Sequence, residues 1–415
     1  MRILGSAFDR KKIKRYGGMV FGHPFLFGVR LASSLVPRSK NVWAFGHPMK
    51  FEGNSKYLFL YVQNEKRSEV TAVWISRNKK VVEDLQGHEY DAAHAHSLRG
   101  IWHMLRAKYF VVDTSVEAIS YWLSGGGEVV NLFHALPIKK MERDVEKGES
   151  TEVLLFHSKG LLKLAMHFLF PWRFVKPSYV ASTSPLYTKV FCSMFRIPET
   201  RVKETGFPRN DVLLKDIKGS EIGIDRGSFE KMGEWKRRGA KIVLYAPTFR
   251  DTGDTSFLEN KEDVQRLNAL MQKHNALFVL KLHPFMKIKV TAGQYSNILD
   301  AAAPTDSYPL LKVAAILVTD YSSIFVDFLL LDRPEIFFAY DLEKYMTKDR
   351  ELYFDYKEFT PGPKAYNFED FLLTLGNVLA GEDDFREARA KQRDLCFSQK
   401  DGESSARVFQ LLRTL

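Results

Sequence analysis

Two neighbouring hydroxyl groups follow an apolar run in the second half of the chain. The run 314–318 leads into Thr319-Asp320-Tyr321-Ser322-Ser323, after which a helical pattern of apolar residues begins. Serine or aspartate fits a helix N-cap, because its side-chain oxygen accepts N–H groups of the first turn. The remaining N–H groups and the helix dipole attract anions. Asp320, Ser322 and Ser323 are therefore candidate phosphate-binding residues, although one capped helix of this kind is more often purely structural.

Two other strands of the same region end in groups that suit a phosphate. A proline follows the run 241–246 and takes the chain out of the sheet, which places Thr248 and Arg250 at the strand's end. Arginine offers a planar fork of donors to phosphate oxygens. The run ending at Leu282 is followed by His283 and a proline, and strand alternation places Lys281 on the same side as His283. Histidine can donate to a phosphate or protonate a leaving oxygen.

Three such strand ends together favour a binding site. The carboxyl ends of parallel strands meet at one edge of a sheet, where ligands bind in open α/β folds. A fixed positive array there would stabilise the charge that develops on a leaving phosphate. The sequence has no evident acidic metal-binding cluster in these segments, so we expect no tightly bound cofactor, with Mg²⁺ possible only as a companion of a phosphate substrate.

The first half of the chain contains a similar strand end. The run 131–140 reads as a strand, then His134, a proline and two lysines, the first of which is Lys139. On the opposite wall of a cleft, His134 could act as the base that takes a proton from an attacking hydroxyl. His94 and His96 have a metal-like spacing, but no carboxylate or thiol accompanies them, which argues against a metal site.

Short β-rich runs separated by helical stretches must position these residues. The first series comprises 41–45, 70–75, 107–113, 129–134 and 179–182, and the second comprises 241–246, 276–282, 315–319 and 335–339. This alternation predicts parallel sheets in two doubly wound α/β domains that face each other across a cleft. We expect an N-terminal segment 1–38, a first domain 39–205, a second domain 206–370 and C-terminal helices 371–415.

Composition excludes several classes of protein. The 415 residues are 45% hydrophobic, which describes a packed chain large enough for two domains. Cys192 and Cys396 lie far apart, so we expect reduced thiols and neither a disulfide framework nor a zinc site. The chain has no GxxxxGK[ST] loop and no GxGxxG after a strand. Its net charge of +11 would suit a polyanion or an anionic membrane, but no nucleic-acid-binding module is recognisable.

The N-terminal segment combines a basic cluster with an apolar stretch. Five cations lie between Arg10 and Arg15, and the aromatic-rich run 19–32 follows them. His23, Pro24 and Arg30 interrupt this run, so it is not a transmembrane helix, and no signal-cleavage pattern indicates secretion. The pattern favours a segment in the membrane interface, with its cations on anionic headgroups. A helix packed on the protein's own surface is the alternative.

Several ordered motifs resemble one family. YAPTFRD, KLHP and VTDYSSIFVDFLLLDRPEIFFAYDLEKY, followed by YFDY and PGP, are similar to the CDP-glycerol glycerophosphotransferases, the teichoic acid primases and polymerases. NSKY at 54–57, GFPRND at 206–211 and DGESSAR at 401–407 also resemble this family. The similarity runs from about Asn41 to the C-terminus, and this set is far more specific than any one motif.

The resemblance implies a GT-B architecture and transfer of a polyol phosphate from a CDP-activated donor to a lipid-linked acceptor, with release of CMP. His134 would be the base and His283 would contact the donor pyrophosphate. Further residues would hold or support the donor phosphates: Thr248, Arg250, Asp320, Ser322 and Ser323, with Lys139, Lys281 and Arg333 as supporting groups. Ala135 stands where the family usually has glycine, and alanine tolerates fewer backbone angles.

The resemblance also implies partners and a location. These are CDP-glycerol or CDP-ribitol, a polyprenyl-linked acceptor and an anionic membrane surface at the cytoplasmic face of the plasma membrane, reached as a peripheral protein. Glycerol is the expected polyol, and a priming or short-addition role is favoured over long polymerisation. A GT-B glycosyltransferase that uses a nucleotide sugar would share the fold. A non-catalytic membrane scaffold with a degenerate transferase fold is a further alternative because of Ala135, but the phosphate-binding residues are all present.

Overall fold

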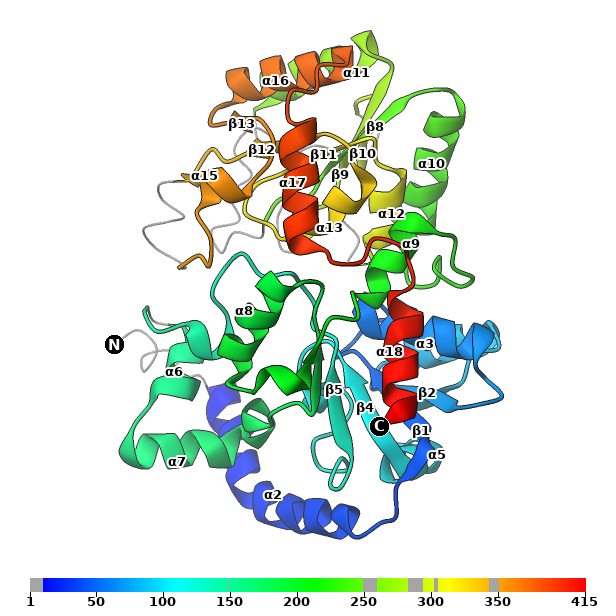
Figure 1. The fold of residues 1–415 in the computed structure, drawn as a ribbon, viewed down its shortest axis with the longest axis vertical. Coiled ribbons are helices and arrows are strands. Elements are labelled where there is room, and N and C mark those ends of the chain that lie inside the picture. The colour runs from blue at the N-terminus through cyan, green and yellow to red at the C-terminus, as the bar shows by residue number, and fades with distance from the viewer. Residues whose placement is uncertain (1–9, 149, 249–259, 283–293, 302–304, 343–350) are drawn as a thin grey trace. The chain divides into compact units, whose positions relative to one another are not determined.

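The computed structural model describes residues 10–148, 150–248, 260–282, 294–301, 305–342 and 351–415, without the side chains of residues 10–21. Its contacts divide the chain into two units (Figure 1). Unit 1 comprises Met1–His134, Lys140–Pro208 and Ser405–Leu415, and unit 2 comprises Ala135–Lys139 and Arg209–Ser404.

Unit 1 is built on a seven-stranded parallel sheet with the order β3-β2-β1-β4-β5-β6-β7. Its strands are β1 (Ser39–Gly46), β2 (Thr71–Ser76), β3 (Ala92–His94), β4 (Ala107–Val112), β5 (Glu128–Asn131), β6 (Tyr179–Ala181) and β7 (Val202–Lys203). Strand order reverses between β1 and β4, which creates the switch point of a doubly wound fold.

Unit 2 repeats this topology with six parallel strands in the order β10-β9-β8-β11-β12-β13. The strands are β8 (Lys241–Tyr245), β9 (Ala276–Leu280), β10 (Ile298–Asp300), β11 (Ile316–Thr319), β12 (Glu335–Phe338) and β13 (Lys364–Ala365). Because β9, β8 and β11 are neighbours, the three strand ends singled out in the sequence belong to adjacent strands.

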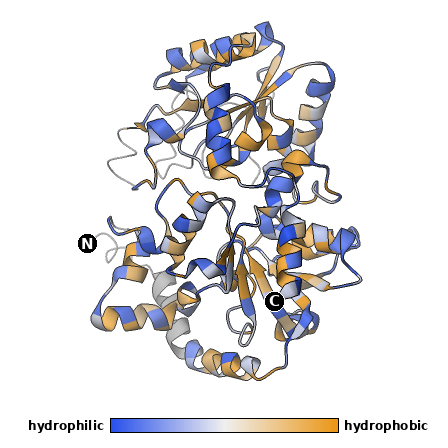
Figure 2. Ribbon diagram, viewed as in Figure 1, coloured by the Kyte–Doolittle hydropathy of each residue, from blue (hydrophilic) through white to orange (hydrophobic). Residues whose placement is uncertain are grey.

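Helices cover the faces of both sheets. Unit 1 contains α2 (Arg10–Ser34), α3 (Gly53–Glu65), α4 (Lys79–Gly87), α5 (Leu98–Arg106), α6 (Thr151–His157), α7 (Gly160–Leu169), α8 (Pro185–Phe195) and α18 (Ser404–Thr414). Unit 2 contains α9 (Asp211–Leu214), α10 (Arg226–Arg237), α11 (Lys261–Lys273), α12 (Tyr308–Val313), α13 (Ile324–Phe328), α15 (Tyr356–Phe359), α16 (Phe368–Ala380) and α17 (Arg386–Cys396). The central strands are buried along almost their whole length, and Figure 2 shows them as hydrophobic. Continuous apolar runs are expected where helices cover both faces of a parallel sheet.

The predicted α/β class with two doubly wound domains is confirmed. The sequence missed β3, β7, β10 and β13, because strands of two or three residues carry no periodic pattern. The contact division falls at Pro208, three residues after the expected boundary. The C-terminal helices 371–415 are not one segment, since α16 and α17 belong to unit 2 whereas α18 packs in unit 1. Cys192 and Cys396 are free thiols.

Candidate active site

The loop after β5 holds His134 at the carboxyl edge of the unit 1 sheet. Asn54, near the start of α3, donates through Nδ2 to the carbonyl of Leu132 at 3.0 Å and to that of Phe133 at 2.6 Å. The Oδ1 of Asn131 accepts from the N–H of Phe133 at 2.9 Å. Leu132 and Phe133 are buried, whereas His134 is exposed. Hydrogen bonds from buried side chains therefore fix the backbone of the loop, while the side chain of its histidine is exposed to solvent.

A backbone carbonyl orients the His134 ring. Nδ1 of His134 lies 3.3 Å from the carbonyl oxygen of Asp113, the residue after β4. A carbonyl can only accept, so this hydrogen bond requires the proton on Nδ1 and leaves the basic lone pair on Nε2. His134 is thus held in the tautomer that a general base needs.

The side chain of Asp113 ties the same edge to α3. It is buried, and its Oδ1 accepts from the N–H of Ser55 at 2.9 Å and from the Ser55 hydroxyl at 2.8 Å. Gly53 has φ +82°, and a Cβ there would collide with the Asp113 carboxylate. Glycine is required at this position both for its backbone conformation and for the close approach.

Ala135 does not strain the His134 loop. The left-handed residue of the loop is Phe133, with φ 54°, and Ala135 is not among the described residues with positive φ. The expectation that alanine restricts the loop in place of glycine is therefore wrong, because the backbone at Ala135 has a conformation that alanine adopts freely.

In unit 2, Asp320 organises the corresponding edge of the sheet. It directly follows β11, is fully buried, and its Oδ1 accepts from the N–H of Thr248 at 2.8 Å and of Ser322 at 3.2 Å, as well as from its neighbour Tyr321. The Tyr356 hydroxyl donates to the Asp320 carbonyl at 3.1 Å. The prediction that Asp320 binds phosphate needs correction, because its carboxylate is taken up by backbone N–H groups and would repel an anion.

Thr248, Ser322 and Ser323 lie together around that aspartate. The Asp320 hydrogen bonds join the residue after β8 to the residues after β11, and all three candidates are half-buried. α13 starts only at Ile324 and is five residues long, with Ser323 as an N-cap that forms no capping hydrogen bond. The serine cap expected from the sequence is therefore not formed, and the N–H groups that Asp320 accepts belong to the loops before α13 and after β8.

The supporting lysines and arginine differ in position. Lys281 follows β9 and donates to the Thr305 hydroxyl at 3.2 Å. Lys139 forms an antiparallel bridge with Leu352 in unit 2. Arg333 donates to the carbonyls of Lys312, at 2.8 Å, and Ala314, which precede β11. Arg333 therefore lies at the amino-terminal edge of the sheet, opposite the phosphate candidates, and its expected supporting role is corrected to a structural one.

Arg250 and His283 lie outside the described residues, so their roles stay predictions. Within the described residues, no three His, Cys, Asp or Glu side chains gather as a metal site. Both ring nitrogens of His94 are occupied, since Nε2 lies 3.2 Å from the Arg77 carbonyl and Nδ1 accepts from the His96 N–H at 3.3 Å.

Sequence reasoning missed a buried charged cluster beneath the unit 2 site. Arg209 donates to Asp327 of α13 at 2.7 Å, and the Tyr308 hydroxyl donates to the same oxygen at 2.8 Å. Burial raises the pKa of Asp327, and the Arg209 guanidinium opposes that rise. The cluster anchors α13 to the GFPRND motif. Two features of the sequence could have indicated it: the arginine of that motif, and an aspartate within the otherwise apolar helical pattern of α13.

Comparison with known proteins agrees with this arrangement. A teichoic acid glycerol-phosphate transferase of Staphylococcus aureus is 26% identical over 94% of this chain and 97% of its own length. A ribitol-phosphate polymerase of the same species is 31% identical, but over 56% of this chain and 44% of its own length. The solved structure of the wall teichoic acid polymerase TagF has a TM-score of 0.74 at 20% identity, and the match covers 98% of this chain and 97% of that one.

A family match spans almost the whole chain. Residues 30–414 match the family described as CDP-Glycerol:Poly(glycerophosphate) glycerophosphotransferase. This range includes both sheets, the His134 loop and the residues around Asp320. The protein belongs to the CDP-glycerol:poly(glycerophosphate) glycerophosphotransferase family.

Proposed function

We propose that this enzyme transfers glycerol phosphate from CDP-glycerol to a hydroxyl of a lipid-linked acceptor and releases CMP. Nε2 of His134 takes the proton of the acceptor hydroxyl, and the resulting oxygen attacks the phosphorus that bears the polyol. A new P–O bond forms, the P–O bond to the bridging oxygen breaks, and CMP leaves with the electron pair.

The geometry of His134 carries this proposal. An exposed imidazole on a buried loop, with its Nδ1 proton committed to the Asp113 carbonyl, has the tautomer and access of a general base. Membership of the transferase family supplies the reaction for which this base is suited.

We assign the donor phosphates to the carboxyl edge of the unit 2 sheet. Thr248, Ser322 and Ser323 supply hydroxyl groups there, and Asp320 fixes the backbone that carries them. Arg250 and His283, assigned from the sequence, would add positive charge against the leaving phosphate. Any Mg²⁺ would accompany the donor, since the reaction needs charge neutralisation and not a metal-bound nucleophile.

Glycerol is favoured over ribitol by the extent of similarity. The glycerol-phosphate transferase aligns along nearly the whole chain, whereas the ribitol-phosphate polymerase aligns along about half. The test is incubation with CDP-glycerol or CDP-ribitol and a polyprenyl-linked disaccharide, with and without EDTA. We expect CMP release and a product heavier by glycerol phosphate. UDP release from a nucleotide sugar, with no reaction of either CDP-polyol, would instead support the glycosyltransferase alternative.

We further propose that the enzyme reaches its acceptor as a peripheral protein on the cytoplasmic face of the membrane. None of the described helices is long and apolar enough to span a bilayer. α2 packs on α7, where Nδ1 of His23 lies 2.9 Å from the Phe168 carbonyl and the Phe27 ring contacts Phe168. The inner face of α2 is thus packed on unit 1, in line with the second interpretation of this segment, and its exposed outer face is the part that would meet the membrane.

Exposed apolar side chains on these two helices suit a membrane surface. Phe25 of α2 is 75% exposed, and Leu161 and Leu164 of α7 are 84% and 66% exposed. Lys159 and Lys163 are exposed beside these leucines. Apolar side chains flanked by cations are typical of helices that lie in the interface of an anionic bilayer.

Point substitutions test this surface better than truncation. Removing residues up to Pro37 would delete Arg30, which donates to the Tyr121 carbonyl, and would therefore disturb the fold. Aspartate at Phe25, Leu161 and Leu164 together should abolish co-sedimentation with phosphatidylglycerol vesicles. The matched control is Leu373→Asp on α16, since Leu373 is also exposed, at 68%. Equal sedimentation of the triple variant and the wild type would contradict the membrane proposal.

A further inference from the structure

A small pocket, partly open to solvent, lies in unit 1 beside the carboxyl ends of β4 and β5. Thr114 and Ser115 line it after β4, and Asn131 lines it at the end of β5. The connection between β5 and β6 contributes its polar wall: Glu142, Arg143 and Arg173. Of these residues, only Asn131 has a part in the site described above, since its Oδ1 supports the His134 loop.

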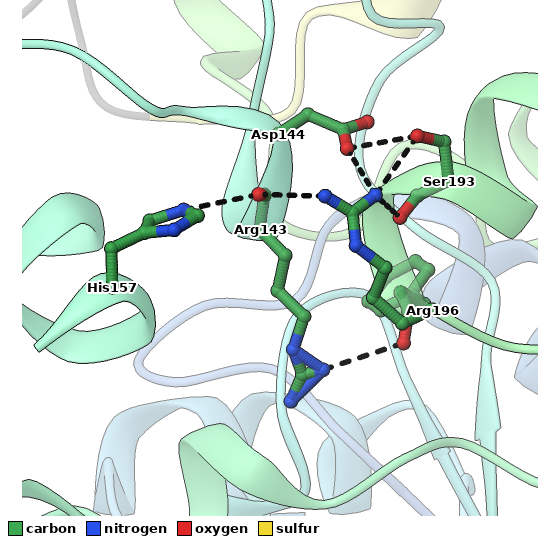
Figure 3. A network of polar contacts seen from close by, with 6 residues as sticks. Arg143, Asp144, His157, Ser193 and Arg196 are labelled. Atoms are coloured by element: carbon green, nitrogen blue, oxygen red, sulfur yellow. Dashed lines mark hydrogen bonds and ion pairs between the residues drawn. The ribbon is translucent and has the colours of Figure 1, made fainter. Parts of the chain in front are cut away.

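The backbone of Arg143 is firmly held, as Figure 3 shows. Its carbonyl accepts from Nε2 of His157 and from Nη2 of Arg196, each at 3.2 Å. Arg196 also pairs with Asp144 at 2.6 Å, and Asp144 accepts from the Ser193 hydroxyl at 2.8 Å. These contacts fix the backbone of Arg143, and none of them involves its guanidinium.

The guanidinium of Arg143 has little hydrogen bonding of its own. Among the described residues its one hydrogen bond is to the Phe195 carbonyl, at 3.4 Å, and it lies 5.0 Å from the Phe156 ring. A guanidinium has five N–H donors, so most of its donor capacity remains for another group. Burial lowers the pKa of Arg143, which reflects the poor solvation of its charge.

The charges around the pocket sum to one positive charge. Arg173 is neutralised by Glu142, with Nη2 at 3.1 Å and 3.2 Å from the two carboxylate oxygens. Arg143 forms no hydrogen bond to a carboxylate among the described residues, although the charge of Glu142 also acts on it, and the neighbouring Asp144 carboxylate accepts from Arg196 and Ser193. A ligand with one negative charge and several acceptor oxygens would complete this arrangement.

We propose that this Arg143 pocket binds one phosphodiester group of the acceptor chain. A phosphodiester has a single negative charge and two non-bridging oxygens, which match the fork of one guanidinium. Thr114, which lines the pocket, directly follows Asp113, whose carbonyl orients His134. An acceptor that already carries a glycerol phosphate unit has a phosphodiester behind the terminal hydroxyl that it presents to His134; the identity of the acceptor rests on the proposed function.

The test is direct binding of glycerophosphoglycerol, a soluble phosphodiester, to the full chain by titration calorimetry without any CDP-polyol. Arg143→Gln should weaken this binding by about 10- to 100-fold, the value of a charge-assisted hydrogen-bonded pair. Arg143→Lys should show an intermediate loss, because it keeps the charge but not the fork. Arg201→Gln is the matched control, since Arg201 is exposed in unit 1 and does not line the pocket.

The outcomes separate this site from the proposed function. Unchanged binding in Arg143→Gln, or an equal loss in Arg201→Gln, would overturn the pocket. A loss of binding to phosphatidylglycerol vesicles alone would overturn it too, since the site would then hold a lipid headgroup. If the wild type binds glycerophosphoglycerol through Arg143 but releases no CMP from CDP-glycerol, the site stands and the proposed function fails. Should Arg143→Gln not fold, Arg143→Lys with unaltered affinity would equally refute the proposal.

Discussion

The two units share one topology and place an aspartate at the same point of it. Asp113 directly follows β4, the fourth strand of unit 1, and Asp320 directly follows β11, the fourth strand of unit 2. Each carboxylate accepts from the segment that follows the first strand of its own unit, which is Ser55 in one case and Thr248 in the other. Both aspartates are buried and both join the two strand ends that flank the switch point.

The difference lies in what each edge presents. In unit 1 the Asp113 carbonyl orients an imidazole, so the edge displays a base. In unit 2 the Asp320 carboxylate accepts hydrogen bonds from backbone N–H groups and so fixes the loops that carry the hydroxyl groups of this edge. Under the proposed function, an equivalently placed buried aspartate would support proton transfer in unit 1 and anion binding in unit 2, without itself touching the substrate.

The largest effect should come from the base. His134→Ala should lower turnover by roughly 10²- to 10⁴-fold, because the acceptor hydroxyl loses its proton acceptor, while donor binding stays unchanged. The measurement is steady-state CMP release together with binding of CDP-glycerol. If a folded His134→Ala protein kept full turnover, His134 would not be the base, and the two carboxyl edges would not differ in the way proposed.

The next effect should come from the aspartates. Asp320→Ala leaves three backbone N–H groups without their acceptor and should lower the free energy of unfolding by about 3 kcal/mol or more, with a higher KM for CDP-glycerol. Asp113→Ala should instead lower kcat, because it loosens the α3 start beside His134. Urea denaturation and separate determination of kcat and KM check both. Identical kinetic changes in the two variants would contradict the division of roles.

A pH-dependent effect should come from the fifth strands, which begin with glutamate in both units. Glu335 of β12 is fully buried, and neither carboxylate oxygen has a hydrogen-bond partner among the described residues, whereas Glu128 of β5 pairs with Lys108 at 2.7 Å. Burial raises the pKa of Glu335 well above 4.5, and the charge of Arg389 only partly opposes this. The stability contributed by Glu335 is thus fully present below its unfolded pKa and is lost as the pH rises through its folded pKa.

Glu335→Gln should therefore gain stability relative to the wild type across that window, by about 1.4 kcal/mol per pH unit. Glu128→Gln is the matched control and should change stability by less than about 1 kcal/mol, since its ion pair is partly exposed. Urea denaturation at about pH 5 and about pH 8 measures both. A difference between Glu335→Gln and wild type that does not depend on pH would show that the carboxyl group is not buried in its neutral form.

The smallest effect should come from Ala135→Gly. Because the positive φ of the loop belongs to Phe133, glycine at Ala135 should leave turnover within about 2-fold and lower stability by at most about 1 kcal/mol. Thermal unfolding and CMP release measure this. A large gain in turnover would mean that alanine does constrain the base after all.

The sequence predicted those features that are encoded locally. Apolar runs located β8, β9 and β11, the first two with a proline after them, and a similar pattern of apolar run, histidine and proline placed His134 after β5. The supporting hydrogen bonds were not predictable, because Asn54 and Leu132 lie 78 residues apart and Asp113 and Ser55 lie 58 apart. No local pattern connects such residues.

Asp320 shows why charge alone misleads. A carboxylate at a strand end beside two serines has the composition of a binding site, and only the N–H groups directed at it identify it as support. The Arg143 pocket could not be predicted from the sequence for a related reason. Its arginines come from a long connection between two strands, where no periodicity marks which side chains point inward.

The return of α18 to unit 1 has a consequence for the order of synthesis. Phe409 of α18 packs on Trp43 of β1, and Arg413 donates to Asn41 at 2.7 Å, so the first strand of the protein is covered by a helix that is translated after all of unit 2. On the ribosome, unit 2 can complete its sheet while the core of unit 1 still awaits its last helix. An isolated unit 1 fragment ending at Pro208 would expose that apolar surface, and a soluble version would have to carry residues 404–415 on a linker.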